Sequence, residues 1–177
     1  MYYVVQVATG KEQKAIDDIN KALSDKSKVD VFSPYRKVLR KYKGEYKEVL
    51  ERCFPGYLFV ETDDPKQLFF DLYEVPDFAR LLGREGLSYY FEPLNKDETR
   101  MVDILYGKEN ERTTSISDIE IEEGDHISVL SGPLMDLKGY VKSVDLHKRK
   151  ITLTVTMFKR PMDVQVGINI VTKLPKS

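Results

Sequence analysis

The hydrophobic positions of residues 1–107 follow two different spacings. Short runs of β-branched and aromatic residues predict strands, and apolar residues three and four apart predict amphipathic helices. The predicted strands are 2–7, 29–34, 57–61 and 78–82. The predicted helices are 11–24, 65–74 and 96–106. This order predicts an α+β fold, an antiparallel sheet with helices on one side, close to a ferredoxin-like sandwich.

One predicted strand, which begins at Tyr57, is apolar on both of its faces. Side chains alternate along a strand, so Tyr57 and Phe59 lie on one face of the sheet and Leu58 and Val60 on the other. Helices of the same domain cover one face. We expect the other face to lack helices, and an exposed apolar sheet face is typical of a site for a large protein partner.

Residues 35–52 predict a long, exposed β-hairpin with Gly44 at its turn. Seven basic and three acidic side chains lie in this range. Two interpretations fit this composition: lysines that keep a sheet edge soluble, or a basic finger beside nucleic acid. In the second interpretation, the residues that lie near DNA are Arg36, Lys37, Arg40, Lys41 and Lys43.

Residues 108–122 are polar and acidic and show no apolar period, which predicts an unfolded linker. The chain is therefore predicted to contain an N-terminal domain over 1–107, this linker, and a C-terminal domain over 123–177. Short strands at close spacing predict that the C-terminal domain is a small β-barrel. Its predicted strands are 126–130, 139–144, 151–157, 162–166 and 169–174. We expect the two domains to move independently.

Charge is unevenly distributed along the chain. The net charge is −1, yet residues 124–177 carry nine Lys and Arg against four Asp and Glu. This basic domain indicates a polyanionic ligand, and a solvated basic face has the same composition. The basic side chains form two groups, one of them beside Phe158, which suits phosphates and a stacked base. The candidate RNA-binding residues are His147, Lys148, Arg149, Lys150, Lys159 and Arg160.

No arrangement of residues predicts an enzyme, a metal site or a bound cofactor. Neither His126 nor His147 has cysteines or carboxylates at metal-ligand spacing, and Cys53 is the single cysteine. Motifs for a phosphate loop or a nucleophile elbow are absent. The start of the chain has no basic leader, and no apolar run approaches the roughly 20 residues of a membrane span. We therefore expect a cytoplasmic protein without a membrane partner.

Two stretches resemble parts of one known family. Residues 123–145, with the Gly132-Pro133 turn and the later Gly139, are similar to a KOW motif. Residues 54–60 resemble the central strand of the NusG N-terminal domain, and residues 2–6 and Phe78 resemble other parts of that domain. The resemblance covers both domains and the linker in the right order, and it points to the NusG/Spt5 family of transcription elongation factors.

The resemblance implies a bacterial, monomeric factor that binds RNA polymerase. Its N-terminal domain would hold the clamp helices of the polymerase through an apolar patch on the sheet. By position, that patch consists of Phe54, Pro55, Tyr57, Phe59 and Phe78. The basic hairpin would lie beside upstream or non-template DNA. The C-terminal domain would be an SH3-like KOW barrel.

Departures from the family pattern indicate a specialised paralogue. Tyr2 stands where the family usually has tryptophan, and Lys159 replaces the glycine of a Phe-Gly-Arg segment that general NusG proteins use to contact Rho or a ribosomal protein. Residues 7–12 resemble the LoaP group of processive antiterminators. For that group the resemblance implies that the KOW domain recognises a leader-RNA hairpin.

Two alternatives remain open on the sequence. A general NusG factor would use the barrel to dock Rho or a ribosomal protein. A ribosomal or ribosome-assembly protein would also hold RNA with a KOW barrel, but it would not need the apolar strand from Phe54 to Phe59.

Overall fold

The computed structural model describes residues 1–76, 79–81 and 91–171. The chain divides into two compact units that do not follow the predicted domains. Unit 1 contains Met1–Pro34 and Phe54–Thr99, and unit 2 contains Tyr35–Cys53 and the chain from Arg100 onward. The predicted hairpin and the predicted barrel therefore lie in the same unit. The independent movement of the two predicted domains stays a prediction.

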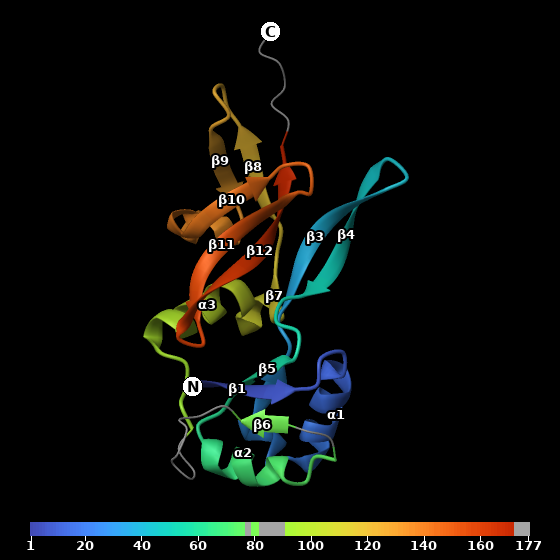
Figure 1. Ribbon diagram of the computed structural model, residues 1–177, viewed down its shortest axis with the longest axis vertical. Coiled ribbons are helices and arrows are strands. Elements are labelled where there is room, and N and C mark those ends of the chain that lie inside the picture. Colours follow the sequence, from blue (N-terminus) through green and yellow to red (C-terminus); the bar gives the residue numbers. More distant parts are fainter. Residues whose placement is uncertain (77–78, 82–90, 172–177) are drawn as a thin grey trace. The chain divides into compact units, whose positions relative to one another are not determined.

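Unit 1 is built on a four-stranded sheet whose order is β2-β5-β1-β6, with every pair antiparallel (Figure 1). The strands are β1 (Tyr2–Val7), β2 (Asp30–Phe32), β5 (Tyr57–Glu61) and β6 (Ala79–Leu81). The helices are α1 (Glu12–Ala22), the short 3-10 helix η1 (Lys26–Lys28) and α2 (Pro65–Leu72). The antiparallel sheet and the two α-helices confirm the prediction of a mixed α and β fold for this part.

One face of this sheet forms the core with α1 and α2. Leu58 and Val60 of β5 are buried against helix residues that include Ile19 and Leu68. Helix α2 begins where the sequence predicts, because Pro65 occupies its first turn and the Asp64 side chain accepts a hydrogen bond from the backbone N–H of Gln67.

Unit 2 contains the predicted hairpin, formed by β3 (Tyr35–Tyr42) and β4 (Glu45–Arg52). Lys43 and Gly44 form its turn, and both have a positive φ, as a two-residue hairpin loop requires. The helix α3 (Lys96–Tyr106) enters this unit from Arg100 onward. It is followed by the 3-10 helix η2 (Lys108–Asn110) and the short β7 (Thr113–Thr114), which pairs with β3 in parallel.

The barrel strands form a five-stranded sheet in the order β10-β11-β12-β8-β9 (Figure 1). The strands are β8 (Ser117–Ile121), β9 (Ile127–Ser131), β10 (Val141–Asp145), β11 (Lys150–Met157) and β12 (Arg160–Ile170). Two 3-10 helices, η3 (Pro133–Asp136) and η4 (Lys138–Tyr140), connect β9 to β10. The predicted strands 162–166 and 169–174 are, over the described residues, one long strand.

The prediction of an unfolded segment over 108–122 is wrong for most of its length. Strand β8 pairs antiparallel with β9 and parallel with the end of β12. Its residues Ser117 and Ile119 are fully buried. Asp118 between them is only partly buried, and because the buried Ser117 is itself polar, the inward positions show no apolar period. The barrel therefore begins at Ser117 rather than at Glu123.

Strand β12 approaches the hairpin so closely that only glycine fits at one position. A Cβ atom on Gly167 would lie 2.3 Å from the Lys37 carbonyl oxygen and 3.0 Å from the Val38 Cα. Both distances are too short for ordinary contact, so Gly167 allows the backbones of β12 and β3 to pack directly against each other. The packing of the hairpin on the barrel is thus encoded in the sequence.

Candidate nucleic-acid interface

Two of the residues predicted to bind polymerase, Phe54 and Phe59, lie together on the second face of the unit 1 sheet. Phe54 and Phe59 pack with ring centroids 5.4 Å apart, and Phe59 stacks on Phe32 at 5.8 Å. Phe54 is 3% exposed and Phe59 is fully buried. The expectation that this face is exposed is therefore wrong for these two rings, which are buried in an aromatic group that includes Phe32. Phe78 lies outside the described residues.

Among the described members of this predicted patch, the accessible ones lie at the turn before β5 and at the first residue of that strand. Pro55 is exposed and Tyr57 is partly exposed. This turn is held in place by a side chain of α1, because the buried Glu12 carboxylate accepts a hydrogen bond of 2.8 Å from the backbone N–H of Gly56. Gly56 has a φ of 83°, and a Cβ atom there would meet the Thr9 hydroxyl at 2.8 Å. Pro55 and Tyr57 are thus presented on a rigid turn.

Glu51 of β4 forms ion pairs with three basic side chains of unit 2. Arg36 donates from Nε and from a terminal nitrogen to Glu51 Oε2 at 3.0 and 2.9 Å, and Arg40 donates to Oε1. Lys150, at the start of β11, lies 3.1 Å from Oε2. Burial opposes ionisation, but the hydrogen bonds from Arg40, Arg36 and Lys150 outweigh it and lower the pKa of Glu51 to about 2.

The hairpin tip carries cations that Glu51 does not neutralise. Lys43 and Lys47 lie over the Tyr42 ring at 5.4 and 5.1 Å, and Lys41 lies over the Tyr46 ring at 6.0 Å. Within the described parts of the chain these lysines form no ion pair. Tyr42 is 57% exposed and Tyr46 is 38% exposed. The tip therefore presents lysines and aromatic faces together.

The first basic group of the barrel meets this hairpin. The Arg149 guanidinium lies 4.7 Å from the Tyr46 ring centroid, on the turn between β10 and β11. The Asp145 carboxylate holds that turn by accepting from the backbone N–H of Lys148 at 2.9 Å. His147 and Lys148 are exposed, whereas Lys150 forms an ion pair with Glu51.

The second basic group lies at the other end of β11, so the sequence-predicted RNA residues are not one cluster. Strand β11 runs for eight residues from Lys150 to Met157, so its two ends are about 23 Å apart. Phe158 and Lys159 form the two-residue turn into β12 with φ values of 55° and 60°. Such a turn favours glycine or asparagine, so Lys159 sits where a side chain is strained. Lys159 and Arg160 are both exposed.

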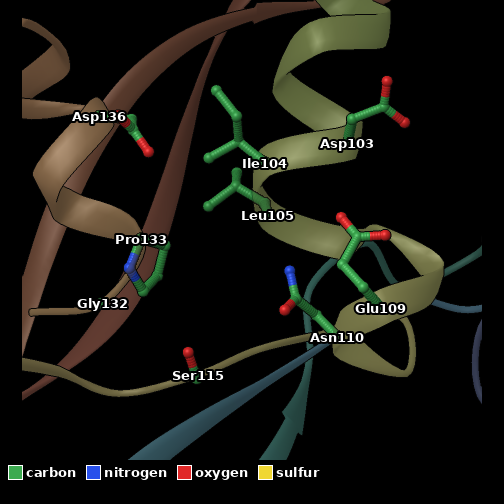
Figure 2. A pocket seen from close by; sticks show the side chains of 9 residues that line it. All are labelled: Asp103, Ile104, Leu105, Glu109, Asn110, Ser115, Gly132, Pro133 and Asp136. Carbon is green, nitrogen blue, oxygen red and sulfur yellow. The ribbon is translucent and has the colours of Figure 1, made fainter.

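A cavity of about 370 Å³ lies elsewhere in unit 2, between α3 and η3 (Figure 2). Ile104 and Leu105 point into it from α3, opposite Pro133 (Figure 2). Three of its lining side chains are the carboxylates Asp103, Glu109 and Asp136. These negative charges repel phosphate, so the cavity is no part of a nucleic-acid surface.

A family model described as "Transcription termination factor nusG" matches residues 1–123. The chain belongs to the NusG family. Membership places it among transcription termination and antitermination factors rather than among enzymes. It is 28% identical to the transcription termination/antitermination protein NusG of Thermus thermophilus, over 97% of each chain. It is 27% identical to that of Staphylococcus carnosus, over 98% of this chain and 95% of the relative.

A solved structure shares the NusG fold. The structure described as "Domain interaction in Thermotoga maritima NusG" superposes with a TM-score of 0.52 and 23% identity, over 94% of this chain and 92% of that one. None of the helices in the described parts of this chain is long and apolar enough to cross a bilayer. The same parts contain no group of three or more His, Cys, Asp or Glu side chains that could hold a metal ion.

Sequence reasoning missed four residues of the hairpin that matter most for the geometry. Tyr42, Tyr46 and Lys47 surround the tip, and Glu51 forms ion pairs with two of the arginines that were expected to face DNA. The signal was the alternation of Tyr and Lys between Tyr42 and Lys47, which places aromatic and basic side chains next to one another across a hairpin.

Proposed function

We propose that this member of the NusG family is a specialised antiterminator in the cytoplasm, similar to the LoaP group. It binds the clamp helices of RNA polymerase with its N-terminal domain and a structured leader RNA with its KOW barrel. By holding the clamp closed it suppresses pausing and termination. No chemical step and no cofactor are needed for this activity.

The observation that carries the RNA half of this proposal is the conformation of Lys159. A lysine with a φ of 60° in a two-residue turn is strained, and the family resemblance gives glycine at this position. Strain that persists in a native structure is concentrated at functional sites. A cation kept at that position supports a phosphate ligand for the exposed Lys159 and Arg160.

RNA binding is tested with the full chain, because a fragment starting at Glu123 lacks β8 and leaves an edge of the sheet unpaired. We expect affinity for a fluorescein-labelled RNA hairpin to fall steeply with salt. At any one salt concentration, the double variant Lys148→Gln with Lys159→Gln should bind this RNA hairpin more weakly than the unmodified chain does. A charge-matched control, Lys21→Gln with Lys26→Gln in unit 1, should not. Affinity that is independent of salt would contradict RNA binding.

Polymerase binding is tested at the accessible end of the predicted patch. Phe59 is fully buried, so its substitution would damage the core. Tyr57→Ala with Pro55→Ser changes exposed atoms on the rigid turn instead. We expect the variant to lose affinity for core RNA polymerase in a pull-down. Tyr73→Ala, which removes an aromatic ring that is 73% exposed in the same unit, is the control. Equal loss in both variants would contradict the assignment.

A second function has support from the barrel surface. Leu130, Met135 and Tyr140 are exposed apolar side chains on or beside η3 and η4. Such a surface suits a protein partner, as expected for a general NusG factor whose barrel docks Rho or a ribosomal protein. Met135→Ser should then abolish capture of purified Rho or ribosomal protein by the full chain. RNA binding would be unchanged.

A further inference from the structure

We infer that the tip of the β3–β4 hairpin and the turn at Leu146–Arg149 form one binding surface, and that it takes the unpaired loop of an RNA hairpin. We call this the composite surface. Its members are Lys41, Tyr42, Lys43, Tyr46, Lys47, His147, Lys148 and Arg149. The inference rests on the proposed RNA-binding function, and it adds to that function the N-terminal hairpin and the kind of RNA bound.

The two halves of the composite surface are joined by a direct contact. Arg149 of the barrel turn lies over the Tyr46 ring of the hairpin, and Lys41 lies over the same ring. Tyr46 therefore contacts a cation from each half. Lys43 and Lys47, on the neighbouring Tyr42 ring, extend the same basic region to the hairpin tip. The two regions were predicted to bind different nucleic acids, but this geometry makes them one surface.

Two further contacts hold the halves in place without taking part in binding. Lys150 pairs with Glu51, which also binds Arg36 and Arg40, so one carboxylate of the hairpin holds cations from both halves. Gly167 lets β12 lie against the backbone at Lys37 and Val38. The hairpin backbone is thus fixed on the barrel at these positions and does not need to be placed there when a ligand binds.

The chemistry of the surface favours unpaired nucleotides. Lysines near exposed tyrosine rings offer a partner for phosphates and a face on which a base can stack. A paired stem keeps its bases stacked inside the helix and can use only the lysines. The loop of an RNA hairpin supplies both groups within a few nucleotides, and the adjacent stem continues the row of phosphates.

The test measures binding of the full chain to three labelled probes: an RNA hairpin with an unpaired loop, the same stem as a blunt RNA duplex, and a single-stranded DNA with the loop sequence. We expect the RNA hairpin to bind most tightly. Tyr42→Leu should weaken it by about tenfold and leave duplex binding unchanged, because one stacked base is lost. Lys43→Gln with Lys47→Gln should reduce the salt slope by roughly 1.5.

Controls separate this inference from the proposed function. Lys21→Gln with Lys26→Gln makes the same change in charge on unit 1 and should leave the salt slope unchanged. If Lys148→Gln weakens RNA binding and the hairpin variants do not, the barrel binds RNA alone and only the composite surface is wrong. Single-stranded DNA that binds as tightly as the RNA hairpin overturns the RNA assignment. Failure of the unmodified chain to bind any RNA overturns both proposals.

Discussion

Glu51 makes the packing of the hairpin on the barrel sensitive to acid. Its carboxylate accepts from Arg36, Arg40 and Lys150, which keeps its pKa at about 2, below the 4.5 of an ordinary glutamate. A lowered carboxyl pKa stabilises the folded state above the ordinary pKa, and this stabilisation is lost as the pH falls toward the folded value. The relevant window is therefore from about pH 4.5 to about pH 2.

We predict that Glu51→Gln destabilises the protein at neutral pH by about 1–3 kcal/mol, because it leaves three cations without their acceptor. The difference from the unmodified chain should shrink as the pH falls through this window, since Glu51 then becomes protonated in both folded and unfolded states. Urea unfolding at several pH values measures it. A difference that stays constant down to pH 2 would contradict the role of ionised Glu51.

In contrast to Glu51, the Lys159 side chain should lower the stability of the folded protein. We predict that Lys159→Gly stabilises the barrel by about 0.5–1 kcal/mol, because glycine adopts a φ of 60° without the strain of a Cβ atom. Lys159→Ala keeps the strain and removes the same charge, so its free energy of unfolding should not rise. RNA affinity should fall equally in both. If Lys159→Ala also raises the free energy of unfolding, the charge of Lys159 and not its backbone conformation destabilises the barrel.

At the scale of elements, strands with long apolar runs were predictable and β8 was not. The sequence pattern found β1, β5 and the hairpin because their own residues carry the period. Strand β8 has only Ser117 and Ile119 fully buried, and its place in the sheet depends on pairing with β12, which is distant in sequence. The ion pair between Glu51 and Lys150 was invisible for the same reason.

Close packing of β12 on β3 gives a prediction with a matched control. Gly167→Ala should destabilise the protein by about 1–3 kcal/mol, because its Cβ atom collides with backbone atoms at Lys37 and Val38, which cannot rotate away. Gly139→Ala, in the same barrel, has nothing within 4 Å of the added Cβ and should be neutral. Thermal unfolding of both variants is the measurement. Equal stability of the two would mean that β12 does not lie against β3.

At the scale of the whole molecule, a net charge of −1 provides no long-range attraction for nucleic acid. Binding must then come from a local group of cations rather than from the overall field. The composite surface offers five, namely Lys41, Lys43, Lys47, Lys148 and Arg149. If all five contact phosphates, the logarithm of the association constant should fall with the logarithm of salt concentration with a slope of about −4.

This slope is measured on the full chain with the labelled RNA hairpin between about 50 and 200 mM salt, a range over which such a slope lowers affinity by a few hundredfold. Random-sequence duplex DNA should bind weakly at the upper end of that range, because stacking contributes nothing to it. A slope near −1 for the RNA hairpin would mean that one cation contacts phosphate. The contact between the hairpin and the barrel would then stabilise the fold without forming an RNA-binding surface.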